Sequence, residues 1–116
     1  MSAVPNVDRE ELRARLARHD PFKLVMAAPH EWAFRAKHIP GSLHFQSAEE
    51  MLAALGKDED VVVYCSNVDC RASLGVIKTL LENGYTHVQH YPGGLIDWET
   101  AGLPLEGNWA GDSPPG

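Results

Sequence analysis

The amino-acid sequence predicts an α/β fold in which parallel strands alternate with helices. The clearest strand is Val61–Tyr64, an uncharged run rich in β-branched residues, as expected when both faces of a sheet are covered. Two capping boxes, which begin at Asp8 and Ser47, each precede an apolar pattern with helical spacing. Because strand and helix patterns alternate, we expect a parallel sheet with right-handed crossovers and helices on both faces.

The individual elements can be bounded by their stop signals. The first helix begins after Asp8 and ends near His19, because Pro21 disfavours helical geometry at the residue before it. Gly56 and the pair Asn83-Gly84 are placed to end two later helices. The expected strands are residues 22–27, 43–45, 61–64 and 87–91, and the expected helices are residues 8–19, 29–37, 47–56, 72–83 and 95–100.

Length and composition limit the class of protein. A chain of 116 residues suits one domain, and a net charge of −6 argues against nucleic acid or an anionic membrane as a partner. No stretch reaches the roughly 18–20 apolar residues of a membrane span, and residues 1–11 lack a secretory signal pattern. We expect a cytoplasmic protein with one domain over residues 1–106. Residues 107–116, rich in Gly, Pro and small polar residues, are expected to form a flexible C-terminal tail.

The segment after the Val61–Tyr64 strand carries the expected chemistry. Cys65 follows the strand at once, six residues come next, and a helix begins. In open parallel sheets, ligands bind beyond the carboxyl ends of the strands. A loop that enters a helix there points backbone N–H groups inward, where they favour a thiolate and hold an anionic substrate. We therefore expect Cys65 to be a catalytic nucleophile, although a cysteine in this place can also be an inert buried side chain. The expected substrate-binding loop consists of Ser66, Asn67, Val68, Asp69, Cys70 and Arg71, the last of which adds a permanent positive charge.

Several segments, taken in order, resemble the single-domain rhodaneses. They are His38-Ile39-Pro40-Gly41-Ser42, Cys65 after its buried strand, Gly84-Tyr85, Gly93-Gly94 with Trp98, and Gly102-Leu103-Pro104. The resemblance covers roughly residues 8–105 and implies a rhodanese-like three-layer sandwich, with a five-stranded parallel sheet and helices on both faces.

The same resemblance implies a sulfurtransferase without a cofactor. Cys65 would attack a sulfane donor such as thiosulfate, become a persulfide, and pass the outer sulfur to a thiophilic acceptor such as cyanide or a thiol. Ping-pong kinetics should follow from these two half-reactions. The implied partners are a small sulfur-containing or oxyanion substrate and a protein or thiol acceptor.

Two departures from the rhodanese pattern leave other functions open. Many rhodaneses carry Asp-x-Arg where this chain has Met26-Ala27-Ala28, and five residues rather than four separate Cys65 from Arg71. The longer loop resembles those of Cdc25-type phosphatases and arsenate reductases, although Asp69 places a negative charge in it. The alternatives are therefore a Cdc25-like phosphatase or arsenate reductase that uses the Cys-x5-Arg loop, and a non-catalytic rhodanese-fold binding module.

Other conspicuous residues have simpler interpretations. Cys70 either resolves a persulfide or sulfenate on Cys65 through a disulfide or packs as a small side chain. We expect no metal site, because zinc bound by the two cysteines would need two further ligands, with only His87 and His90 as candidates. The aromatic residues expected in the core are Trp32, Phe34 and Trp98. His38 should form a local hydrogen bond. The residues expected on a solvated helix face are Arg9, Arg13, Arg15 and Arg18.

Overall fold

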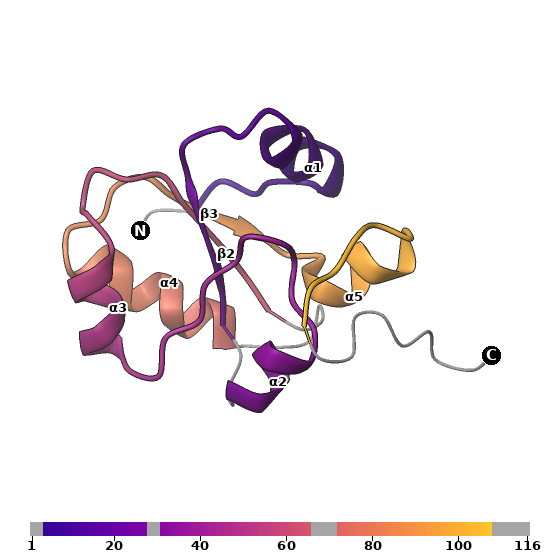
Figure 1. Cartoon of the computed structure of the whole chain (residues 1–116). Coiled ribbons are helices and arrows are strands. Elements are labelled where there is room, and N and C mark those ends of the chain that lie inside the picture. Colours follow the sequence, from indigo (N-terminus) through magenta and orange to yellow (C-terminus); the bar gives the residue numbers. More distant parts are fainter. Residues whose placement is uncertain (1–3, 28–30, 66–71, 108–116) are drawn as a thin grey trace.

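The computed structural model describes residues 4–27, 31–65 and 72–107. Three strands, β1 (Lys23–Met26), β2 (Val61–Tyr64) and β3 (Val88–Tyr91), form a parallel sheet in the order β1-β2-β3 (Figure 1). β2 is central, and all four of its side chains are buried. The uncharged, β-branched run in the sequence therefore forms the doubly covered strand that it predicts.

Five helices surround this sheet in the described part of the chain. They are α1 (Arg9–Ala17), α2 (Glu31–Ala36), α3 (Ala48–Ala54), α4 (Ala72–Glu82) and α5 (Gly94–Thr100). Two of them begin at the predicted caps. The Asp8 carboxylate accepts a hydrogen bond from the Glu11 N–H at 2.8 Å, and the Ser47 hydroxyl accepts one from the Glu50 N–H at 3.1 Å. No helix among the described residues has the length and apolar character needed to cross a bilayer.

The two faces of the sheet bury different helices, because side chains alternate along each strand. One face packs against α3 and α4, and the other against α1 and α5 (Figure 1). The buried residues of the first group include Val25, Val61, Val63, Met51 and Leu80. Those of the second group include Leu24, Val62, Tyr64, Leu12 and Trp98. The predicted α/β arrangement with helices on both faces is confirmed.

The expected five-stranded sheet is not found, since the described residues form three strands. The outer positions are filled by single parallel bridges, in which Leu43 pairs with Val25 beside β1 and Asn6 pairs with His90 beside β3. The expected strand at residues 43–45 is reduced to one bridge, because the chain has only a few residues there before Ser47 caps α3. Beside β3, Pro5 cannot donate a hydrogen bond and Asp8 already caps α1.

One expectation about the core was wrong. Trp98 is buried and Phe34 is partly buried, but 64% of the Trp32 surface is exposed. Leu74 of α4 is 55% exposed, because the buried face of this helix runs through Ser73, Ile77 and Leu80. These three positions are four and three residues apart, so they follow one helical face. Leu74 lies beside that face and points away from the sheet.

Candidate functional site

Cys65 lies at the carboxyl edge of the sheet, directly after the central strand. Its carbonyl oxygen accepts a hydrogen bond from the Leu95 N–H in α5 at 2.8 Å. The carbonyl oxygen of the preceding residue, Tyr64, accepts one from the Ala27 N–H at 2.7 Å. Segments after β1 and β3 therefore both fix the backbone around Cys65, at the edge where parallel sheets bind ligands.

The Cys65 side chain is 2% exposed, and its Sγ lies 3.3 Å from the carbonyl oxygen of Ala27. A carbonyl oxygen can accept a hydrogen bond from a thiol, but its partial negative charge disfavours a thiolate. Cys65 is disulfide-bonded in the structure. Nucleophilic chemistry at this sulfur consequently requires the reduced protein and donor groups that outweigh the Ala27 carbonyl.

The predicted substrate-binding loop falls outside the described residues. It comprises Ser66, Asn67, Val68, Asp69, Cys70 and Arg71. The anion cradle and the role of Arg71 therefore stay predictions. The description ends at Cys65 and resumes at Ala72, the first residue of α4, so it includes the two residues that flank the loop.

Tyr64, the buried residue before Cys65, is hydrogen-bonded to the turn at residues 38–42, which is the HIPGS turn. The Tyr64 hydroxyl accepts a hydrogen bond from the Ile39 N–H at 3.0 Å and donates one to the Ser42 hydroxyl at 2.9 Å. Ser42 in turn donates to the Ile39 carbonyl at 2.6 Å. Burial raises the pKa of Tyr64 to about 12, against the opposing effect of the Ser42 hydrogen bond. Sequence analysis missed Tyr64, although a polar ring tip in an otherwise apolar strand usually needs a buried partner.

The other end of the HIPGS turn is tied to the last described segment. His38 and Glu106 exchange two backbone hydrogen bonds, each 2.9 Å long. The His38 Nδ1 lies 2.8 Å from the Phe34 carbonyl oxygen, which confirms the local hydrogen bond predicted for this residue. The turn is thus held from the strand side by Tyr64 and from the C-terminal side by Glu106.

The glycine and tryptophan motifs hold α5, the helix that contacts Cys65. Gly94, the first residue of α5, has φ +70°, a conformation that a side chain disfavours. The Trp98 Nε1 donates to the Pro104 carbonyl at 2.8 Å. The Tyr91 hydroxyl donates to Asp97 at 2.6 Å, and burial, followed by this hydrogen bond, raises the pKa of Tyr91. These contacts place Leu95 where it can bind the Cys65 carbonyl.

The end of β1 near Cys65 is apolar. Met26 and Ala27 are buried in the place where many rhodaneses carry a charged pair, and Ala28 lies outside the described residues. A cavity of about 300 Å³ adjoins this edge between α3 and α4, and Ala27, Ala72 and Gly75 contribute to its lining. All the described residues that line the cavity are uncharged.

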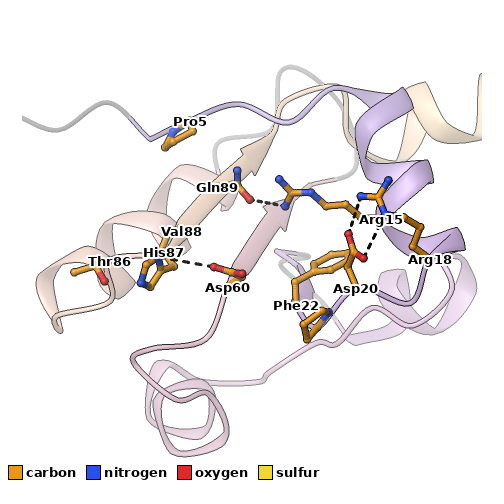
Figure 2. A pocket seen from close by; sticks show the side chains of 11 residues that line it. Pro5, Arg15, Arg18, Asp20, Phe22, Asp60, Thr86, His87, Val88 and Gln89 are labelled. Atoms are coloured by element: carbon orange, nitrogen blue, oxygen red, sulfur yellow. Dashed lines mark hydrogen bonds and ion pairs between the residues drawn. The ribbon is translucent and has the colours of Figure 1, made fainter.

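A second cleft, of about 530 Å³, lies at the opposite, amino-terminal edge of the sheet (Figure 2). Six of its polar side chains form three pairs. Arg18 pairs with Asp20 at 2.8 Å, His87 lies 3.8 Å from Asp60, and Arg15 donates to Gln89 at 2.6 Å. This cleft is separated from Cys65 by the length of the strands.

The arginines of α1 correct the simple picture of a solvated face. Arg9 donates to Asp97 of α5 at 3.0 Å, and Arg15 bridges Gln89 of β3 and Glu11. Arg13 and Arg18 keep well-exposed side chains. Long arginine side chains reach neighbouring elements from a helix face, so the sequence pattern alone did not reveal these tertiary contacts.

The histidines weighed as zinc ligands have other partners. His87 faces Asp60, and the His90 Nε2 lies 3.1 Å from the Ser73 hydroxyl. Burial lowers the pKa of His90. Within residues 4–27, 31–65 and 72–107, no three His, Cys, Asp or Glu side chains are grouped to hold a metal ion.

Several characterised proteins resemble this chain in sequence. It is 38% identical over 96 residues to the Sulfur carrier protein TtuD of Thermus thermophilus, covering 66% of this chain and 33% of that protein. It is 32% identical over 105 residues to a Sulfurtransferase of Allochromatium vinosum, covering 88% of this chain and 94% of that protein. The HTH-type transcriptional regulator Rv0324 of Mycobacterium tuberculosis is 34% identical over 85 residues, which cover 72% of this chain and 37% of the regulator. The chain therefore spans only about a third of the length of two of these relatives.

Solved structures also resemble this chain in fold. The solution NMR structure of the rhodanese-like domain of the Anabaena protein Alr3790 superposes with a TM-score of 0.81 at 24% identity, covering 98% of this chain and 87% of that one. The family model of the Rhodanese-like domain matches residues 8–101. Together with the HIPGS turn, the cysteine after the central strand and the glycine-tryptophan set around α5, this match identifies the family. The chain belongs to the rhodanese-like domain family.

Proposed function

We propose that this protein is a sulfurtransferase or sulfur carrier that receives sulfane sulfur on Cys65 and passes it to a thiophilic acceptor. The observation that carries the proposal is the position of Cys65 at the carboxyl end of the central strand, with its carbonyl held by Leu95. The names of the Thermus sulfur carrier and the Allochromatium sulfurtransferase support the same chemistry. We further propose that residues 1–106 form the working domain, with residues 107–116 as a tail.

The proposed reaction has two balanced half-reactions. In the first, the Cys65 thiolate attacks the outer sulfur of a donor such as thiosulfate. A Cys–S–S⁻ persulfide forms, the donor S–S bond breaks, and sulfite leaves with the electron pair. In the second, an acceptor such as cyanide attacks the outer sulfur, thiocyanate leaves, and the thiolate is restored. No external oxidant or reductant enters the cycle once Cys65 is reduced.

The residues after Cys65 would supply the charge stabilisation. The Ala27 carbonyl near Sγ opposes an anion, so the N–H groups of residues 66–71 and the Arg71 guanidinium must provide more stabilisation than Ala27 removes. We propose this role for Ser66, Asn67, Val68, Asp69, Cys70 and Arg71 as the substrate-binding loop. The side chain of Arg71 is the one permanent cation in that loop.

The acceptor has space beside the cysteine edge. The uncharged cavity of about 300 Å³ between α3 and α4 can take the body of a small thiol or a side chain of a protein acceptor. A cytoplasmic location, which we also propose, would keep Cys65 reduced, because cytosolic thiols are held in that state.

Steady-state kinetics tests the proposal. Thiocyanate formation by the reduced protein, measured at several thiosulfate and cyanide concentrations, should give the parallel double-reciprocal lines of a ping-pong reaction. Cys65→Ser should remove the activity. Cys70→Ser is the comparison variant and should keep thiocyanate formation, because it retains the nucleophile, Arg71 and the backbone N–H of residue 70 through which the loop is proposed to act.

Two other outcomes would redirect the assignment. Hydrolysis of an aryl phosphate or reduction of arsenate, without thiocyanate formation, would identify the Cys-x5-Arg loop as that of a phosphatase or arsenate reductase. Inactivity of the reduced, folded protein in all three assays would leave a binding module.

A further inference from the structure

A hydrogen bond between Ser73 and His90 is the feature that the proposed reaction does not yet use. Ser73, the second residue of α4, is 2% exposed, and its hydroxyl oxygen lies 3.1 Å from the Nε2 of His90 in β3. A buried hydroxyl without a partner is costly, so this contact satisfies Ser73. It also ties the first turn of α4 to β3.

The pair lies one strand away from the segment that leads to Cys65. His90 is aligned with Val63 of β2, and Val63 packs in the layer formed with α3 and α4. Cys65 is two residues beyond Val63, about 6–7 Å farther along the chain and directly after the end of β2. His90 thus lies in the strand next to β2, level with the residue two positions before Cys65.

The charges around His90 are few and of both signs. Lys78 and Glu82 of α4 line the same cavity as His90, while Val4 and Asn6 contribute uncharged side chains from the N-terminal segment. Burial lowers the pKa of His90, which favours the neutral ring. The Nε2 of a neutral imidazole accepts a hydrogen bond from the Ser73 hydroxyl in one tautomer and donates one to it in the other, so the bond persists in either.

We propose that Ser73 and His90 are positioning residues for Cys65. The inference rests on the proposed function, since it concerns the thiolate used there. The chain that leaves Cys65 re-enters the described structure at the first turn of α4. Backbone N–H groups at the start of a helix favour an anion, and the position of this turn depends on how it is held. The Ser73–His90 bond holds it against the strand next to the one that leads to Cys65.

The test compares variants that break the bond with one that keeps it. Ser73→Ala and His90→Leu remove it, whereas His90→Gln places an amide near the position of Nε2 and restores it without a titrating ring. His87→Gln is the matched control, because His87 is exposed and its ring lies 3.8 Å from Asp60, at the opposite edge of the sheet from Cys65. For each reduced protein, the rate of iodoacetamide alkylation at Cys65 is measured by peptide mass spectrometry between about pH 5 and pH 9, beside thiocyanate formation.

Ser73→Ala and His90→Leu should each slow alkylation at neutral pH by about fivefold, the equivalent of one hydrogen bond, and move its pH midpoint upward. The thiocyanate kcat should fall by a similar factor while the KM for thiosulfate changes little. His90→Gln should recover most of both losses, and His87→Gln should match the unaltered protein. The double variant Ser73→Ala/His90→Leu should be no slower than either single one.

Unchanged midpoints in folded Ser73→Ala and His90→Leu would overturn the inference, while an active Cys65 would leave the proposed function intact. Failure of the unaltered protein to form thiocyanate would refute the proposed function instead. If Ser73→Ala and His90→Leu do not fold, His90→Gln decides the matter, since loss of its alkylation rate while it stays folded would contradict the positioning role.

Discussion

At the scale of single residues, the hydroxyl of Tyr64 connects the strand that leads to Cys65 with the HIPGS turn. It joins the end of β2 to Ile39 and Ser42, so the HIPGS turn is a support for the strand that carries Cys65. The turn is separated from Tyr64 by more than twenty residues of sequence. The motif therefore acts through a buried hydrogen-bond network at a distance from the sulfur.

Tyr64→Phe tests this support. The substitution keeps the ring but leaves the Ile39 N–H and the Ser42 hydroxyl without the partner they bind now. We expect the free energy of unfolding to fall by about 1–3 kcal/mol, the cost of unsatisfied buried groups. Urea unfolding at neutral pH measures it, and an unchanged midpoint would show that the network contributes nothing.

The same tyrosine predicts that the free energy of unfolding decreases at alkaline pH. Its pKa is raised by burial to about 12 from an ordinary value of 10.0. Between these two values the unfolded chain has lost the proton while the folded protein retains it. Stability should therefore decrease as the pH rises from about 10 toward 12. Urea titrations across this range should show a weaker dependence in Tyr64→Phe, and equal slopes would contradict the assignment.

His90 predicts a loss of stability on the acid side. Burial lowers its pKa from the ordinary value of 6.5, so the folded protein resists protonation that the unfolded chain accepts. Its contribution to stability is complete above about pH 6.5 and is lost as the pH falls from there through the lowered pKa. His90→Gln should flatten the acid limb of the stability curve, measured by urea unfolding. An identical limb in both proteins would rule out His90 as its source.

At the scale of elements, the segment after α5, residues 102–107, contacts α5, the HIPGS turn and α2. Pro104 accepts from Trp98, Glu106 pairs with His38, and Gly107 packs against the end of α2. A Cβ at Gly107, where φ is +125°, would stand 2.5 Å from the Ala36 carbonyl oxygen. The segment thus depends on a glycine at one contact point, for reasons of both space and backbone conformation.

Gly107→Ala and Gly102→Ala separate these two reasons. Both glycines have positive φ, but a Cβ at Gly102 meets nothing within 4 Å. We expect Gly102→Ala to cost about 1 kcal/mol through backbone strain alone, and Gly107→Ala to cost clearly more because backbone atoms must move. Thermal unfolding of the two variants checks the order. Equal losses would mean that the close approach to Ala36 is relieved without cost.

At the scale of the whole molecule, local sequence patterns predicted the layers well and the edges poorly. The apolar run at Val61–Tyr64 and the caps at Asp8 and Ser47 led directly to the α/β fold, because each depends on neighbours in the chain. The three-stranded outcome was missed, since whether Leu43 forms a strand or a single bridge is decided by the space between two turns.

The candidate site divides in the same way. The position of Cys65 followed from its place after a buried strand, and the family followed from ordered motifs. The contacts of Tyr64 with Ser42 and of Ser73 with His90 join residues 22 and 17 positions apart in the sequence. A periodic sequence pattern therefore cannot predict them. Trp32 was placed in the core because of its size alone, although the short helix α2 turns it outward.

Intact-mass spectrometry of the reduced protein after exposure to thiosulfate tests sulfur transfer through Cys65 most directly. We expect an added mass of about 32 Da, one sulfur atom, that maps to the Cys65 peptide, disappears with cyanide and is absent from Cys65→Ser. A reduced, folded protein that gains no such mass, or gains it equally in Cys65→Ser, would contradict the account.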